Sequence, residues 1–257
     1  MLQKLEKADI VFFGELHDNP IAHWLEYEIA NDLYLTKKGN LILAAEMFES
    51  DNQLLIEEYL NGLISEKKFE DEARLWTNYK TDYKALIKLA KDKSLTFIAS
   101  NLPGRYASIV ANKGFEGLEK LSDKAKEYIA PLPIIYDPEV KCYKDMMNMQ
   151  HGIGTMNKPN ENFPKAQAIK DATMAHFILQ NWSEGKLIIH YNGSYHSDNY
   201  EGIIWYIKQY NKEINIMSIS TILNDNIDKP DVESFNRADF IIVVPENMTR
   251  TYATTLM

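Results

Sequence analysis

The sequence predicts an α/β fold: a three-layer, mostly parallel sheet with helices on both faces and a helical insertion or lid. Apolar segments of strand length recur along the chain, and helical patterns separate them. The segments are continuous rather than alternating, as in strands buried on both faces, and strand–helix alternation is typical of a parallel sheet. The expected strands are Ile10–Phe13, Leu41–Ala45, Leu95–Ala99, Leu187–Tyr191, Ile214–Ile219 and Phe240–Val244.

Two helix starts carry clear signals. Asn19 is a good cap and Pro20 suits the first helical position, so a helix is expected from there to about Lys38. A second helix is expected to begin at Ser50, where Gln53 would complete a capping box.

Later helical patterns complete the alternation. One helix is expected over about residues 81–93 and another from Pro164 to Gly185, whose apolar stripe has helical spacing. The stretch of about 123–162 breaks the rhythm, because it is Met-rich and flanked by prolines, and it is interpreted as a helical insertion or lid. We find no linker or tandem repeat, so residues 1–257 are expected to form one domain.

Composition excludes several classes of protein. The 257 residues carry a net charge of −9, which argues against a nucleic-acid partner. The single cysteine, Cys142, allows no internal disulfide. No apolar run approaches the ~20 residues of a transmembrane segment. The start "MLQKLEKAD" has no central apolar stretch, so no signal or lipid anchor is expected within this chain.

Polar residues follow the expected strands. Ligands of open parallel sheets bind beyond the carboxyl ends of the strands. Glu15 and His17 follow the first strand, Glu46 follows the second, and His196 follows the fourth. Helix starts should add further polar groups to this edge: Asp18, His23, Arg105, Gln167, Lys170 and Asp171.

Two of these strand ends nearly repeat each other, as "IVFFGELHDN" and "LIIHYNGSYHSDN". Each contains Gly-x-x-His, with Gly14 and His17 in the first and Gly193 and His196 in the second. The glycines are expected where the chain turns sharply and takes a positive φ. We therefore expect both turns to direct a histidine into one cleft.

The ordered set of motifs resembles the ChaN-type haem-binding, iron-regulated lipoprotein family of the Tiki superfamily. The matching stretches are "GELHDN", "AAEMF", "LWTNYKTDYKALIKLAKDKSLTFIASNLPGR", "AQAIKDATMAHFI" and "NGSYHSDNYEGI". The resemblance implies a bacterial protein of haem and iron uptake in the cell envelope, associated with the outer membrane. It also implies a homodimer that holds haem through tyrosine, with an outer-membrane haem receptor as a possible partner.

This resemblance gives a first set of candidate haem residues. Tyrosinate is a hard donor that suits ferric haem, and Tyr195, Tyr143 and Tyr136 are the best placed tyrosines. The alternative for each is a core or interface side chain. Lys170 and Arg105 could pair with the propionates or be surface cations. His151 could be an axial ligand or a helix-end residue. The Met-rich run 146–149 could be a porphyrin wall or ordinary packing.

A second hypothesis is a metal-dependent hydrolase, a protease or esterase. Other Tiki members use two GxxH motifs and glutamate to hold a divalent metal ion, which here would be held by Glu15, His17, Glu46 and His196. The ion would lower the pKa of its bound water, and Glu15 or Glu46 would act as the catalytic base. The alternative is a metal-free hydrogen-bonded network that braces the loops. Nucleotide binding through "HGIGT" is excluded, because this pair of glycines follows no strand.

Overall fold

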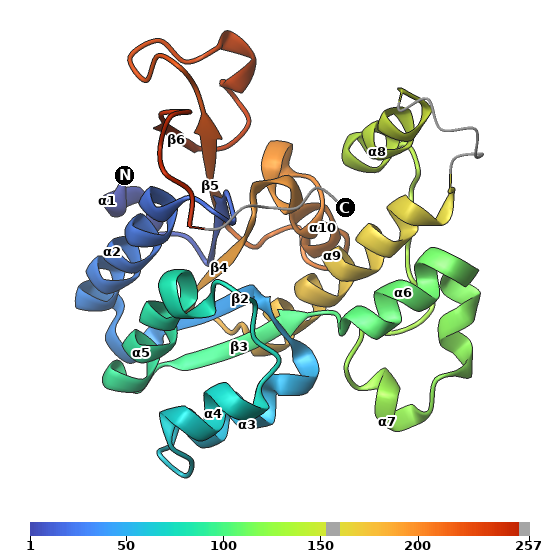
Figure 1. The fold of residues 1–257 in the computed structure, drawn as a ribbon, viewed down its shortest axis with the longest axis horizontal. Helices are drawn as coiled ribbons and strands as arrows, with labels where there is room; N and C mark the ends of the chain where they lie inside the picture. Colours follow the sequence, from blue (N-terminus) through green and yellow to red (C-terminus); the bar gives the residue numbers. More distant parts are fainter. Residues whose placement is uncertain (153–159, 252–257) are drawn as a thin grey trace.

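A six-stranded sheet forms the centre of the molecule (Figure 1), in a computed structural model that describes residues 1–152 and 160–251, without the side chains of residues 150–152. All neighbouring strands are parallel, in the order β3-β2-β4-β1-β5-β6. Each expected strand is present within a few residues of its predicted bounds. The strands are β1 (Ile10–Glu15), β2 (Leu41–Glu49), β3 (Thr96–Asn101), β4 (Leu187–Gly193), β5 (Ile216–Leu223) and β6 (Phe240–Val244).

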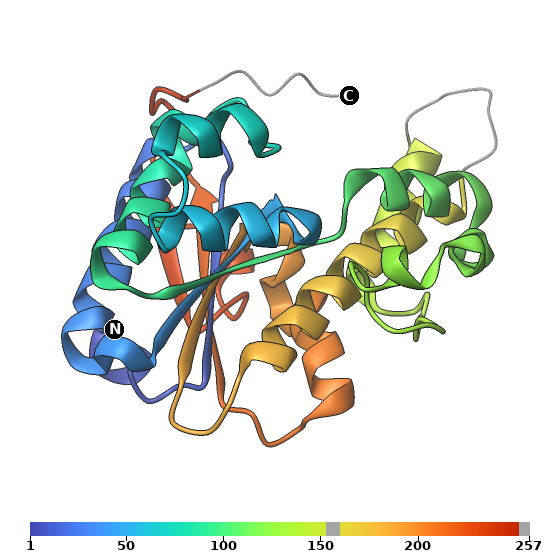
Figure 2. The same ribbon diagram turned by 90° about the horizontal axis from the view of Figure 1, so that it is seen from below.

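Helices cover both faces of the sheet (Figure 2), which confirms the predicted three layers. Side chains alternate across the strands: Val11 and Phe13 join the core under one helical layer, whereas Ile10 and Phe12 join the other. The first layer consists of α1 (Leu2–Leu5), α2 (Pro20–Lys37), α3 (Gln53–Leu60), α4 (Glu66–Glu72) and α5 (Lys84–Lys93). The second consists of α9 (Asn162–Asn181) and α10 (Ile203–Tyr210).

The capping predictions have opposite outcomes. The prediction for α2 is confirmed, because the Asn19 side chain accepts hydrogen bonds from the amides of Ile21 and Ala22. The capping box at Ser50 is wrong. The Ser50 hydroxyl donates instead to the Tyr128 carbonyl, and the Gln53 side chain bonds to the backbone of β3. Backbone partners that are distant in sequence, on β3 for Gln53 and at Tyr128 for Ser50, therefore replace local capping.

A smaller helical region extends from the outer side of α9 (Figure 2). Its helices are α6 (Gly104–Lys113), α7 (Asp123–Lys126) and α8 (Lys141–Gly152), and a separate apolar cluster joins α6 to α9. In its described residues, the stretch of about 123–162 that we interpreted as an insertion thus contains the helices α7 and α8, joined by irregular chain. Among the described residues, no helix is long and apolar enough to cross a membrane.

The strand order creates a crevice between β1 and β4. These strands are neighbours, yet the helix after β1 is α2, in one layer, and the helix after β4 is α10, in the opposite layer. Two neighbouring strands whose connections leave toward opposite faces open a crevice at their carboxyl ends, where ligands bind in sheets of this type. Both GxxH turns lie at this point, and β2, which carries Glu46, is the next strand.

Candidate functional site at the carboxyl edge of the sheet

A cleft of about 380 Å³ lies at the carboxyl edge of the sheet. Both GxxH turns line it, so the structure brings the two strand ends together, and α8 and α9 each add a side chain. Its lining residues are Glu15, Leu16, His17, Asp18, Met146, Gln167, Gly193, Ser194, Tyr195 and His196.

The glycines of the two turns are required for close packing. A Cβ at Gly193 would lie 2.6 Å from Nε2 of His17, and one at Gly14 would lie 2.9 Å from the Cα of Ser194. The predicted positive φ is wrong for both: Gly193 has a φ of −54°, and Gly14 is not among the residues with positive φ. Each glycine therefore makes room for a part of the other turn.

His196 forms the centre of one buried charged network. Its Nε2 lies 3.2 Å from Oε1 of Glu46, and its Nδ1 pairs with Asp171. Asp171 also accepts a hydrogen bond of 2.7 Å from the Tyr143 hydroxyl, and the second Glu46 oxygen accepts one from the Gly193 amide at 2.8 Å. Burial alone would lower the pKa of His196, but the charges of Glu46 and Asp171 outweigh it and raise the pKa to about 10.

His17 belongs to a second network, on the β1 side of the cleft. Its Nδ1 lies 2.5 Å from Oε1 of Glu15, and its ring packs edge-on against Trp76 at 4.9 Å between centroids. Burial would lower the pKa of His17, but the hydrogen bond with Glu15 raises it. Among the cleft histidines, His17 is thus half-buried and solvent-accessible, whereas His196 is buried.

Behind His17 lies a cluster that the sequence analysis only partly anticipated. His23 was expected at this edge and is buried there, facing both Glu15 and Glu26. The Tyr83 hydroxyl donates to Glu15 at 2.8 Å. Glu26 and Tyr83 were missed. The spacing of His23 and Glu26, three residues apart on α2 next to the carboxylate at the end of β1, is the signal that could have found Glu26.

The three candidate tyrosines occupy different environments. Tyr195 lines the cleft, is 36% exposed, and donates its hydroxyl to the carbonyl of Cys142. Tyr143 is completely buried beneath Asp171. Tyr136 packs against the ring of Tyr143, in the core on the face of the sheet that α9 and α10 cover. Burial raises the pKa of all three phenols in the haem-free chain.

The two candidate cations also differ. The Arg105 guanidinium lies 2.6 Å from Asp51 and stacks over Tyr106, and it is not among the residues that line the cleft. Lys170 is half-buried on α9, and its charge contributes to the lowered pKa of Glu46. The side chain of His151 lies outside the described residues.

The four residues expected to hold a metal ion form two close pairs among the described residues. Glu15 pairs with His17, and Glu46 pairs with His196, in two separate networks. Within the described part of the chain, one set of three or more potential metal ligands has all its ligand atoms within 4.8 Å of one another, and this set is Glu15, His23 and Glu26.

Comparison with known families decides the assignment. The family described as "Haem-binding uptake, Tiki superfamily, ChaN" matches residues 1–207, which include every lining residue of the cleft. The chain belongs to the ChaN family of the Tiki superfamily. No protein of curated function matches the sequence.

A solved structure of a ChaN protein has the same fold. The chain is similar to the Campylobacter jejuni protein described as "Cofacial heme binding to ChaN", with a TM-score of 0.68, 19% identity, and coverage of 94% of this chain and 89% of that one. Weaker similarity extends to a mutant of the erythromycin esterase EreC in its open conformation (TM-score 0.49, 13% identity, coverage 86% and 72%). The type III effector HopBA1 is also similar (TM-score 0.47, 14% identity, coverage 96% and 92%).

Proposed function

We propose that this ChaN-family chain binds haem in the cleft between β1 and β4 and that Tyr195 is the iron ligand. One observation carries the choice of residue. Of the three candidate tyrosines, Tyr195 is the one that lines the cleft and reaches solvent, whereas Tyr143 is completely buried in the core. Membership of the haem-binding uptake family supports the ligand class.

The residues present fit a haem. Leu16 and Met146 offer apolar surface to a flat macrocycle, and the Tyr195 hydroxyl offers an oxygen ligand. Lys170, at the same edge, is a cation suited to a propionate. Ferric haem, when bound, supplies positive charge that favours the ionised phenol.

The same cleft supports a dimer with paired haems. The cleft is open to solvent, so it leaves room for a second chain beside a bound ligand. The related protein from Campylobacter jejuni binds haem cofacially. We propose that two copies of this chain meet at their clefts and enclose two haems between them.

The proposal for location and further partners rests on family membership alone. We propose that the protein acts in haem uptake at the cell envelope, as an outer-membrane-associated lipoprotein that exchanges haem with an outer-membrane receptor. Hydrolysis is not proposed, because the family that matches the chain is a haem-binding one.

Titration of the purified chain with hemin tests the proposal. We expect saturation at one hemin per chain, accompanied by conversion of monomer to dimer in sedimentation velocity. Leu16→Asp places a charge in the cleft and should weaken binding at least about tenfold, because an unpaired carboxylate is costly against an apolar ligand. Leu35→Asp is the matched control, since Leu35 is 64% exposed on α2 and does not line the cleft. Absence of saturation in the wild type, or equal binding by both variants, would reject this site.

A further inference from the structure

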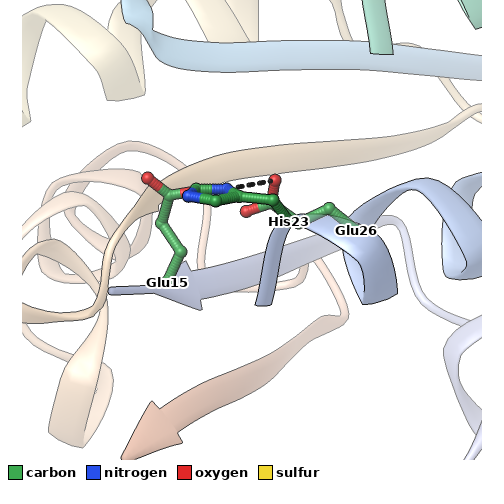
Figure 3. Close-up of side chains that lie close together, drawn as sticks. All are labelled: Glu15, His23 and Glu26. Carbon is green, nitrogen blue, oxygen red and sulfur yellow. Dashed lines mark hydrogen bonds and ion pairs between the residues drawn. The ribbon is translucent and has the colours of Figure 1, made fainter. Parts of the chain in front are cut away.

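A buried group of potential ligands lies next to the cleft, on the α2 side of β1 (Figure 3). Glu15 comes from the end of β1, and His23 and Glu26 come from the first turns of α2. Their relative exposures are 1%, 6% and 0%. Figure 3 shows the imidazole of His23 between the two carboxylates.

The distances within this group differ from those of a simple ion pair. Nδ1 of His23 lies 3.1 Å from Glu15 and 3.3 Å from Glu26, whereas hydrogen bonds between charged N–H donors and carboxylates are usually about 2.7–2.9 Å. A single N–H cannot point at both oxygens. Ligand atoms that share one ion at about 2.0–2.2 Å are separated by about 3.0–3.4 Å, the spacing seen here.

Oε2 of Glu15 and Oε1 of Glu26 accept no hydrogen bond among the described residues, and Oε2 of Glu15 has the ion-pair contact of 3.1 Å with Nδ1 of His23. Leaving a buried carboxylate oxygen without a hydrogen bond is costly, because burial removes its hydration without full replacement. Hydrogen-bond donors within reach are already shared: the Tyr83 hydroxyl bonds to the other oxygen of Glu15. A cation between the carboxylates would satisfy both.

The surroundings hold these side chains as the outer shell of a metal site does. Nε2 of His23 lies 3.3 Å from the carbonyl oxygen of His17, which can accept its N–H and leave Nδ1 free to bind an ion. The Tyr83 hydroxyl donates to Glu15 and fixes that carboxylate. Metal-binding histidines and carboxylates are characteristically oriented by such contacts.

We propose that Glu15, His23 and Glu26 bind one divalent first-row transition-metal ion, such as Zn²⁺ or Mn²⁺. One imidazole and two carboxylates are ligands that these ions accept. A pocket of about 280 Å³ reaches His23 and Asp82 from the surface between α2 and α5, and it provides a route of entry that is separate from the cleft. The site does not depend on haem binding.

Metal uptake by the untagged, haem-free chain tests the site. After treatment with a chelator, the protein is titrated with Zn²⁺ and with Mn²⁺ by calorimetry, and bound metal is counted after dialysis. We expect one ion per chain and a higher thermal unfolding temperature in its presence. A wild-type chain that takes up neither ion overturns the proposal, whether or not hemin binds.

Two variants locate the ion. Glu26→Gln keeps the shape but removes a charged ligand, and it should weaken uptake at least about tenfold. Glu28→Gln is the control, because it makes the same change on the same helix outside the group. The ion-free Glu26→Gln chain should fold at least as stably as the wild type, since the change removes one of the two buried carboxyl groups that face the same imidazole. Uptake that survives in Glu26→Gln and is lost in Glu46→Gln would place the ion in the cleft and overturn the assignment.

Discussion

The imidazole of His17 lies directly against the backbone of Gly193, so closely that a Cβ at residue 193 would lie 2.6 Å from its Nε2. This contact joins the two similar turns of the sequence, which stand 179 residues apart when Gly14 is compared with Gly193. The paired strands β1 and β4 bring the turns together, and each turn needs its glycine because the other turn fills the space.

Gly193→Ala should therefore disturb the cleft more than the fold. The added methyl group must displace the His17 ring, which is the partly exposed partner of the contact. We expect about 1–3 kcal/mol of destabilisation from overpacking and a measurable loss of hemin affinity. Gly39→Ala is the control, because a Cβ there would meet nothing within 4 Å. Wild-type hemin affinity in Gly193→Ala would show that the position of His17 does not matter for the ligand.

Asp171→Asn should destabilise the chain strongly. Asp171 pairs with buried His196 and accepts a hydrogen bond from Tyr143, so its neutralisation leaves the imidazolium with one carboxylate partner. Breaking a buried ion pair from one side costs about 3 kcal/mol or more, and urea unfolding measures it. Tyr143→Phe removes only the hydrogen bond and should cost about 1–3 kcal/mol. Equal losses in the two variants would mean that the charge pair adds nothing.

The His196 network should also make stability depend on pH. Its folded-state pKa of about 10 lies above the value near 6.5 of an unfolded chain, so its stabilisation is complete below about pH 6.5 and is lost as the pH rises toward about 10. The pKa of Glu46 is lowered, because its charge attraction to His196 outweighs burial, so its contribution is present above about pH 4.5 and is lost as the pH falls.

Urea unfolding of the wild type and of His196→Gln at several pH values measures how much His196 contributes to the free energy of unfolding. The difference in free energy of unfolding should shrink by up to about 1.4 kcal/mol per pH unit between about pH 7 and pH 9.5. A difference that stays constant over this range would show that His196 is neutral in the folded chain.

Much of the fold could be predicted from sequence. Continuous apolar runs gave strand positions within a few residues, and Asn19-Pro20 gave the start of α2. The strand order could not be predicted, because it depends on which connections cross which face. The failure at Ser50 has the same cause: Gln53 finds its partners on β3, far away in the sequence.

The candidate site was predicted in part. Reading the residues after each strand found Glu15, His17, Glu46 and His196, and the parallel sheet explains why they converge. The sequence could not show that these residues divide into two networks, because helices supply further partners. Asp171 pairs with His196, and Glu26 faces His23. In the sequence, Glu26 is an ordinary helical position, and only the fold places it near Glu15. Exposure, which separates Tyr195 from Tyr143, is likewise a property of packing.

The most direct test of haem binding through Tyr195 is the absorption spectrum of the hemin complex in the wild type, Tyr195→Phe and Tyr136→Phe. The account predicts a high-spin charge-transfer band of tyrosinate haem in the wild type and in Tyr136→Phe, and loss of this band with weakened binding in Tyr195→Phe. A Tyr195→Phe complex with the wild-type spectrum and affinity would contradict it. Loss of the band in Tyr143→Phe instead would move the iron ligand to α8.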